Sequence, residues 1–278
     1  MTERSGPGRL VLVATPIGNL ADLSPRAIEA MSTAALVCCE DTRRTGRLLQ
    51  HAGVRAQRLA VANDHTELAR INDVLDVLAA GGDVAVVTDA GTPGVSDPGE
   101  RLVRAALDAG YDVTAVPGPA AAVMALTISG LPTSRFVFEG FLPRSGRERA
   151  ERVAEVAAEA RTSVLYEAPH RIQRTLADLR AACGEARPVA VCRELTKLFE
   201  EVVRGTLGEV TIDQPRGEYV VVLAGRPVES TAIDDDTIRA ALRAEISAGS
   251  SKKDAVSSVS KQLGAARKTV YALAVTLD

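Results

Sequence analysis

The sequence predicts an α/β fold of two lobes, followed by a small helical domain at the C-terminal end. The chain has 278 residues, of which 46% are hydrophobic and 25% charged, the balance of a globular protein with one large or two ordinary domains. Short β-branched runs alternate with amphipathic windows up to about residue 116, and further runs then follow with shorter connections. This composition excludes disordered, collagen-like and mucin-like proteins.

The first lobe, residues 1–120, alternates strand and helix patterns as mostly parallel sheets do. Ser24 followed by Pro25 predicts a helix start, because serine caps a helix and proline suits its first turn. We expect strands at residues 10–14, 35–39, 58–62, 84–88 and 112–116, and helices at 24–31, 43–51, 66–79 and 99–109.

The second lobe, residues 121–226, places several strands close together, which predicts a mixed sheet with antiparallel pairs. Residues 227–236 contain proline and consecutive aspartates, and we expect a linker there. Residues 237–278 have the pattern of a helix-turn-helix tail. The strands of the second lobe are expected at residues 135–139, 163–167, 189–193, 200–204 and 219–224.

Charge is unevenly distributed along the chain. The formal net charge is −3, which argues against a surface covered with nucleic-acid-binding groups, so any RNA contact is expected to be local. Only five of the 33 basic residues are lysines, and four of these lie in the last 27 residues. Lys197 is therefore the single lysine of the two lobes, which marks it as a candidate for chemistry that arginine cannot perform, with arginine-biased composition as the alternative.

Cysteine and histidine usage predicts a reducing compartment. The four cysteines have no CxxC spacing and the three histidines are scattered, so we expect no structural metal. The apolar runs are too short for a signal peptide or a membrane span. We expect a cytoplasmic protein with no membrane contact.

Three loops rich in glycine and proline follow strands of the first lobe, at residues 14–20, 88–100 and 116–122. Ligands bind at the carboxyl ends of strands in open α/β sheets, and such loops present backbone groups to them. The dinucleotide fingerprint and the P-loop are both missing. Each loop alone could be an ordinary turn, but together they predict a bound small molecule with polar and apolar parts.

Seven motifs carry a resemblance to a known family. The chain resembles the ribosomal small-subunit (16S) RNA cytidine 2′-O-methyltransferases, which are similar in fold to the tetrapyrrole methylases. The resemblance covers roughly residues 9–226 and implies a two-lobed class III methyltransferase fold, S-adenosyl-L-methionine bound between the lobes, and a homodimer that modifies the decoding region of the small ribosomal subunit. The motifs are ATPIGNL at 14–20, EDTRRTGRLL at 40–49, TDAGTP at 88–93, PGPAA at 117–121, FEGFLP at 138–143, YEAPHR at 166–171 and RELTK at 193–197.

The resemblance also implies which residues act. A ribose hydroxyl is a weak acid, so a neighbouring base or cation is expected to assist its attack on the methyl group. The catalytic candidates are Lys197, Glu167, His170 and Glu194, with Glu40 and Asp41 from the first lobe. Lys197 is expected to shed its proton when desolvated, whereas packing for His170 and ion pairing for Glu194 are the alternatives. The implied cofactor-binding residues are Ile17, Asp89, Thr92, Val95, Ala120, Ala121, Tyr166 and Leu195.

Substrate contact is expected through local arginines. Arg43, Arg44 and Arg47 share one predicted helix face, and Arg144, Arg147, Arg149 and Arg152 form a second group, although solvated helix faces look the same. Arg171 and Arg193 are further candidates.

The tail, residues 250–278, carries five basic residues against two aspartates, a net charge of +3. This predicts an element that docks on ribosomal RNA, with a packing hairpin as the alternative.

Two other functions stay open at this point. A tetrapyrrole or other small-molecule methyltransferase of the same fold would have no use for a basic tail. A non-catalytic nucleotide-binding regulator with a DNA-binding tail would not need the RELTK and YEAPHR segments.

Overall fold

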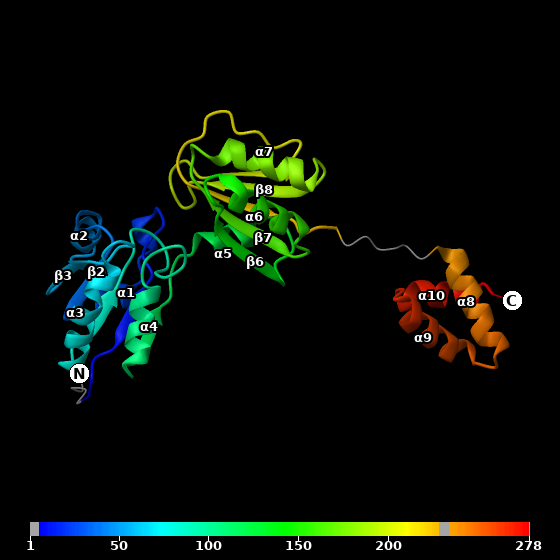
Figure 1. Cartoon of the computed structure of the whole chain (residues 1–278), viewed down its shortest axis with the longest axis horizontal. Coiled ribbons are helices and arrows are strands. Elements are labelled where there is room, and N and C mark those ends of the chain that lie inside the picture. The colour runs from blue at the N-terminus through cyan, green and yellow to red at the C-terminus, as the bar shows by residue number, and fades with distance from the viewer. Residues whose placement is uncertain (1–5, 228–233, 278) are drawn as a thin grey trace. The chain divides into compact units, whose positions relative to one another are not determined.

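A computed structural model describes residues 6–227 and 234–277 (Figure 1). The chain divides into two compact units between Arg226 and Pro227, and each is described by itself. The first unit contains both α/β lobes.

The first lobe is built on a five-stranded sheet with the strand order β3-β2-β4-β1-β5, in which every pairing is parallel. The predicted alternation of strands and helices is confirmed. The strands are β1 (Leu10–Val13), β2 (Leu36–Cys39), β3 (Leu59–Val61), β4 (Val84–Val86) and β5 (Val113–Val116). The helices are α1 (Pro25–Thr33), α2 (Thr42–His51), α3 (Glu67–Ala79) and α4 (Glu100–Asp108), with a 3-10 turn at Leu20–Asp22.

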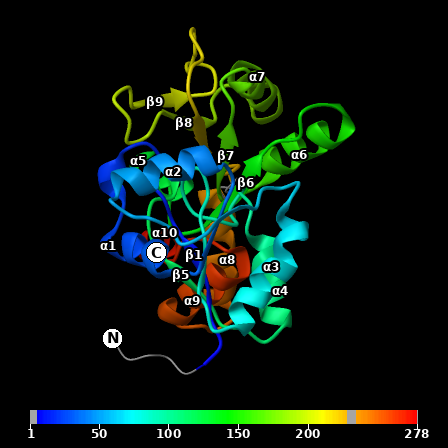
Figure 2. The same cartoon turned by 90° about the vertical axis from the view of Figure 1, so that its left-hand side faces the viewer.

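Helices cover both faces of this sheet, which Figure 2 shows from the side of the first lobe. Helices α3 and α4 pack on one face, and α1 and α2 on the other, because the strands place buried apolar side chains alternately on the two faces. Ser24 caps α1 as predicted, its hydroxyl accepting a 3.1 Å hydrogen bond from the Ala27 N–H.

The second lobe contains a mixed five-stranded sheet with the order β6-β7-β10-β8-β9. Strands β6 and β7 are parallel and the other three pairings are antiparallel, as the short connections predicted. The elements are α5 (Ala121–Ile128), β6 (Phe136–Phe141), α6 (Gly146–Ala158), β7 (Thr162–Glu167), α7 (Ile172–Cys183), β8 (Pro188–Arg193), β9 (Glu201–Thr206) and β10 (Tyr219–Leu223).

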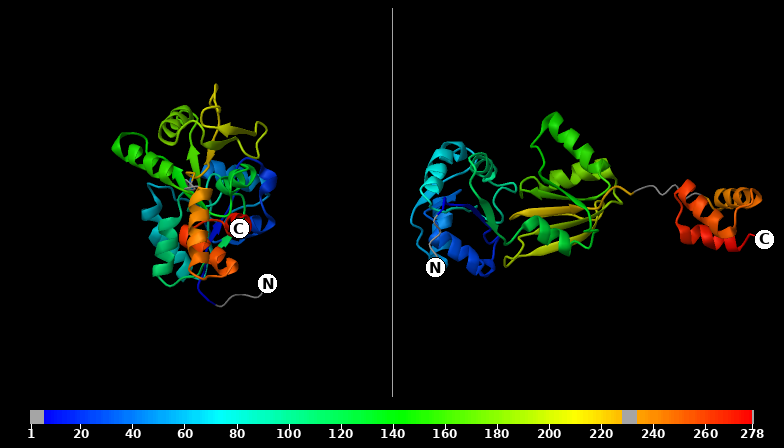
Figure 3. Two further views of the ribbon diagram at one scale, coloured as in Figure 1. Left: turned by 90° about the vertical axis from the view of Figure 1, so that its right-hand side faces the viewer. Right: turned by 90° about the horizontal axis from the view of Figure 1, so that it is seen from below.

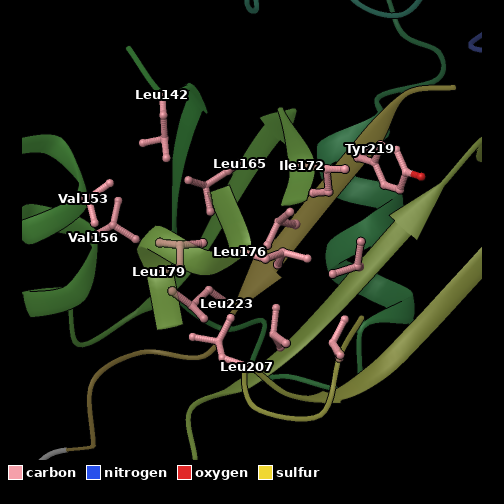
Figure 4. Close-up of a cluster of buried hydrophobic side chains, with 14 residues drawn as sticks. Leu142, Val153, Val156, Leu165, Ile172, Leu176, Leu179, Leu207, Tyr219 and Leu223 are labelled. Carbon is pink, nitrogen blue, oxygen red and sulfur yellow. The ribbon is translucent and has the colours of Figure 1, made fainter. Parts of the chain in front are cut away.

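The core of the second lobe lies between α6, α7 and one face of the sheet. Figure 4 shows leucine and valine side chains from both helices, such as Val153 and Leu176, directed toward Leu165 and Leu223 of the strands. Helix α5 packs on the opposite face of the sheet and forms a second apolar cluster there, which also includes Ile17 of the first lobe. This cluster therefore connects the lobes next to the ATPIGNL loop.

The second unit consists of α8 (Asp235–Ser247), α9 (Lys252–Leu263) and α10 (Arg267–Val275), which share their own apolar core (Figure 3). Residues 228–233 of the expected linker lie outside the described residues. Its last two residues, Asp235 and Asp236, instead form the first turn of α8, because Asp234 caps that helix by accepting from the Thr237 N–H.

Candidate active site

The three loops rich in glycine and proline meet at one edge of the first sheet, because they follow the neighbouring strands β4, β1 and β5. Thr15 and Gly91 exchange backbone hydrogen bonds of 2.8 and 3.1 Å, which join the first loop to the second. The Thr92 hydroxyl donates to the Pro119 carbonyl at 3.1 Å, which joins the second to the third. The loops thus form one braced surface at the carboxyl ends of the strands.

A cavity of about 720 Å³ lies between this surface and the second lobe. Its walls contain all eight residues expected to bind a cofactor, namely Ile17, Asp89, Thr92, Val95, Ala120, Ala121, Tyr166 and Leu195. They also contain all four residues of the second lobe expected to be catalytic, Glu167, His170, Glu194 and Lys197, together with Glu40 of the first lobe. Their chemical roles stay predictions.

Aromatic rings form part of the wall from the second lobe. Tyr166 contacts Phe138 and Phe141 edge to face, with ring centroids 5.1 and 5.7 Å apart. Its hydroxyl accepts a hydrogen bond from the Ala122 N–H in the first turn of α5. Burial raises the pKa of Tyr166, so the phenol stays neutral.

Glycines allow the segments around the cavity to approach closely. A β-carbon on Gly18 would overlap the Lys197 side chain, and one on Gly217 would overlap the Glu194 carboxyl group. Gly140 has a φ of +61°, and a β-carbon there would lie 3.1 Å from Ser96 Oγ of the first lobe. The lobes are therefore in contact on two sides of the cavity.

Lys197 is held between two carboxylates. Its Nζ lies 2.8 Å from Glu194 Oε1 and 3.2 Å from Glu218 Oε2. Partial burial alone would lower the pKa of Lys197, but the hydrogen bond to Glu194 and the charge of Glu218 outweigh it and raise the pKa. These contacts favour the charged form of Lys197, in contrast to the expectation that it sheds its proton.

Glu194 is correspondingly held as a carboxylate. Burial alone would raise the pKa of Glu194, but the hydrogen bonds from Lys197 and the Glu218 N–H lower it. The ion-pairing alternative for Glu194 therefore applies, with Lys197 and not Arg193 as the partner, since Arg193 instead pairs with Glu201 at 3.1 Å.

Glu167 and Arg171 bind to each other and to the protein framework. The Glu167 carboxylate is fully buried, lies 3.2 Å from Arg171 Nε and accepts from the Thr175 hydroxyl. Arg171 also donates to the Leu142 and Pro143 carbonyls. These bonds fix the position of both side chains beside the cavity, and their predicted catalytic and RNA-binding roles stay predictions. His170 is exposed at the rim of the cavity.

The predicted basic groups differ in what they contact. Arg44 pairs with Asp89 at 3.2 Å, and Arg44 and Arg47 line a second cavity of about 310 Å³ that shares Arg44 and Asp89 with the first. Arg43 instead pairs with Asp41, the cap of α2, at 2.8 Å. Arg144 is exposed before α6.

Helix α6 does not present the basic face that the pattern suggested. Arg149 is buried and bonded to Asp178, Thr175 and the Pro143 carbonyl. The exposed neighbours Arg147 and Arg152 pair with glutamates. The spacing of arginines along the helix could not predict these pairs. Asp178 and Glu139 lie on other elements, and Glu151 and Glu155 lie one turn from their arginines on the same helix.

The cavity also contains an acid that sequence reasoning did not single out. Burial, reinforced by the charges of Glu40 and Asp89, raises the pKa of Asp97 to about 7. The pKa of Glu40 is also raised, because burial raises it more than the hydrogen bond from the Asp89 N–H lowers it. The available signal for Asp97 was its position inside the 88–100 loop, between Ser96 and Pro98.

Among the residues that the structure describes, no group of three or more histidine, cysteine, aspartate or glutamate side chains could hold a metal ion. Within the same residues, no helix has the length and hydropathy needed to cross a membrane.

Comparison with known proteins identifies the family. Residues 9–211 match the family of tetrapyrrole (corrin/porphyrin) methylases. A protein of Synechocystis named ribosomal RNA small subunit methyltransferase I is 42% identical over 98% of this chain and 99% of its own length. A Mycobacterium tuberculosis protein of the same name is 46% identical, over 91% of this chain and 89% of its own.

Solved structures show the same fold at lower identity. The crystal structure of the methyltransferase CobJ superposes with a TM-score of 0.61 and 22% identity, covering 80% of this chain and 95% of that one. The chain therefore belongs to the tetrapyrrole methylase family and, within it, to the ribosomal RNA small subunit methyltransferase I proteins.

Proposed function

We propose that this protein transfers a methyl group from S-adenosyl-L-methionine to the ribose 2′-oxygen of a cytidine in the 16S ribosomal RNA of the small ribosomal subunit. The observation that carries this proposal is the similarity, along almost the whole chain, to ribosomal RNA methyltransferases. The cavity between the lobes supplies the place where donor and acceptor would meet. We place the reaction in the cytoplasm.

The residues that line the cavity support S-adenosylmethionine as the cofactor. Ile17, Val95 and Leu195 provide apolar walls for an adenosine group. Ala120, the residue that precedes α5, has no side chain that could cap the helix, so the backbone N–H of Ala121 is available to an acceptor atom of the cofactor. Asp89 Oδ1 is buried without a hydrogen-bond partner, as expected of an acceptor that a polar ligand completes.

Carboxylates give this cavity an affinity for a cation. Six acidic residues line it against only two basic ones, Arg44 and Lys197, and the acids are Glu40, Asp89, Asp97, Glu167, Glu194 and Glu218. A sulfonium ion is therefore favoured there over an anionic group. S-adenosylmethionine, when bound, supplies an already activated methyl group.

The protein's own task is then mainly positioning. Holding two reactants in line contributes about 7–11 kcal/mol to lowering a barrier. The braced loops of the first lobe and the rings of Tyr166 and Phe138 form the rigid walls that such positioning requires.

The second cavity provides a contact for the RNA. Arg44 and Arg47 line it beside the Asp89 wall that it shares with the first cavity. Arginine binds phosphate through paired hydrogen bonds, so these two side chains would hold the backbone near the ribose to be methylated.

The test uses small ribosomal subunits from a strain that lacks this protein. Incubation with the purified protein and S-adenosylmethionine should add one ribose methyl group to a cytidine of the 16S RNA, mapped by mass spectrometry of RNA fragments. Titration calorimetry should show binding of S-adenosylmethionine. Methylation of a tetrapyrrole with none of the RNA would contradict the proposal and support the small-molecule alternative.

We further propose that the protein is a homodimer. Leu198 and Phe199 lie in the loop between β8 and β9 with 90% and 71% of their surface exposed, which is unusual for neighbouring large apolar side chains. Light scattering should give twice the mass of one chain, and Phe199→Asp should shift the mass toward the monomer. A monomeric wild-type protein would contradict the proposal.

A further inference from the structure

One acid of the main cavity has no partner. Asp97 lines the cavity, and neither a hydrogen bond nor an ion pair engages its carboxylate among the described residues. Each of the other five acids in the wall is engaged: Glu40 with the Asp89 N–H, Asp89 with Arg44, Glu167 with Arg171, and Glu194 and Glu218 with Lys197. A carboxylate kept without a partner at a cavity wall is available to a ligand.

The segment that carries Asp97 is held rigidly from the first lobe. The buried Glu67 carboxylate on α3 accepts hydrogen bonds of 3.0, 3.1 and 3.2 Å from the N–H groups of Gly99, Arg101 and Leu102. The Gly94 N–H donates to the Pro98 carbonyl at 3.0 Å and closes the loop around Asp97. Glu67 is thus a positioning residue for this loop.

The same segment is also constrained from the second lobe. Ser96 has a φ of +61°, a conformation that costs a non-glycine residue free energy and persists where the surroundings impose it. Its hydroxyl lies against Gly140 of β6, where a larger residue would not fit without displacing it. The loop that carries Asp97 is therefore held at the cavity wall by contacts from both lobes.

Charges around Asp97 favour its neutral form. After burial, the largest contributions to its raised pKa of about 7 come from Glu40 and Asp89, followed by Asp64 and Glu218. The cations that line the cavity, Arg44 and Lys197, are each paired with other acids. A group with this pKa is ionised in about half of the molecules near neutral pH, and it then accepts a proton more readily than an ordinary carboxylate.

Lys197 and Glu167, two other candidates for proton removal, are each engaged by groups of opposite charge. Lys197 is held as an ammonium group by two carboxylates, and the Glu167 carboxylate is buried against Arg171. His170 is exposed at the rim.

We propose that Asp97 is the general base of the reaction, an inference that rests on the proposed function above. The ribose 2′-oxygen forms a bond to the methyl carbon while the carbon–sulfur bond breaks and leaves its electron pair on sulfur. The hydroxyl proton passes to the Asp97 carboxylate and leaves to solvent after the product departs.

The experiment compares Asp97→Asn and Asp97→Glu with the wild-type protein on unmethylated small subunits. The matched control is Asp108→Asn, an exposed aspartate of α4 whose carboxylate pairs only with Arg104. Single-turnover rates with saturating cofactor are measured from about pH 5.5 to 9, and the cofactor dissociation constant is measured by calorimetry at about pH 8.

We expect the wild-type rate to rise with pH to a plateau, because a protonated carboxyl group cannot accept the hydroxyl proton. The midpoint should lie at or below about 7, since a bound cation favours ionised Asp97. Asp97→Asn should lower the plateau by about 10²–10⁴-fold, abolish this pH dependence and leave the dissociation constant within about threefold. Asp97→Glu should retain the pH dependence, and Asp108→Asn should match the wild type.

Three results would overturn the inference. An Asp97→Asn protein that keeps the wild-type rate, or that keeps the same pH dependence, would show that another group takes the proton. A cofactor dissociation constant that rises in parallel with the loss of rate would make Asp97 a cofactor-binding residue instead. Absence of ribose methylation by the wild-type protein would be a different result, since it would overturn the proposed function itself.

Discussion

Asp97 and Lys197 line the same cavity, and both have raised pKa values with opposite consequences for charge. The surroundings of Asp97 favour its neutral form, whereas the carboxylates beside Lys197 favour its charged form. The acid is thereby suited to accept a proton near neutral pH, and the lysine is not. Both assignments lead to measurable results at the scale of single residues.

Ionisation of Asp97 is expected to destabilise the native protein. Asp97 keeps its proton up to about pH 7 in the native state, whereas in the unfolded chain it loses the proton near pH 3.8. Its contribution to the free energy of unfolding therefore falls as the pH rises between these two values. Asp97→Asn should therefore raise the thermal unfolding midpoint at about pH 8 and leave it unchanged at about pH 3. Scanning calorimetry checks this, and a lower midpoint at about pH 8 would contradict it.

The charge of Lys197 is expected to matter more than its ability to lose a proton. Lys197→Met leaves Glu194 and Glu218 without their cation and should raise the Glu194 pKa. We expect its methyl-transfer rate to fall about tenfold or more, which corresponds to about 1.4 kcal/mol in the barrier. Lys197→Arg keeps the charge and should retain more of the rate than Lys197→Met. Equal rates for the two variants would count against this role.

At the scale of helices and strands, Arg149 joins three elements of the second lobe. Its guanidinium group is almost fully buried and binds Asp178 and Thr175 of α7 and the Pro143 carbonyl after β6. The arginine therefore fixes α6 against α7 beside the loop that leads to the cavity.

Removal of this side chain should destabilise the lobe strongly. Arg149→Ala leaves buried acceptors without a donor, and we expect a loss of about 3 kcal/mol or more in the free energy of unfolding, measured by urea denaturation. The matched control is Arg147→Ala on the same helix, which breaks only an exposed pair with Glu151 and should cost about 0.5 kcal/mol or less. Similar losses for both variants would contradict the structural role of Arg149.

Across the whole molecule, the net charge of −3 conceals a basic C-terminal part. Residues 250–277 contain five basic side chains and one aspartate, and Lys253, Lys261 and Lys268 are exposed. We propose that this part contacts RNA phosphates.

The double variant Lys261→Glu, Lys268→Glu should weaken binding to small subunits and flatten its salt dependence. Each lost phosphate contact should reduce the slope of log affinity against log salt by about 0.7–0.9. Arg243→Glu, an exposed arginine of α8, is the control and should change the slope less. Filter binding at several salt concentrations measures this, and an unchanged slope in the double variant would favour the packing alternative.

Local sequence patterns were sufficient for much of the fold and for part of the site. The Ser24 cap, the alternation in the first lobe and the mixed second sheet could be predicted, because each depends on residues close in the sequence. The loops that line the cavity could also be located, since consecutive glycines and prolines after a strand are visible without a partner.

Contacts between distant residues decided the rest. The charge state of Lys197 depends on Glu218, 21 residues away, and the burial of Arg149 depends on Asp178, 29 residues away. Asp97 became a candidate base because Glu67 and Gly140 hold its loop and because neighbouring acids come from other elements. Burial and electrostatic fields arise from all neighbours in space, so these properties cannot be predicted from the order of residues along the chain.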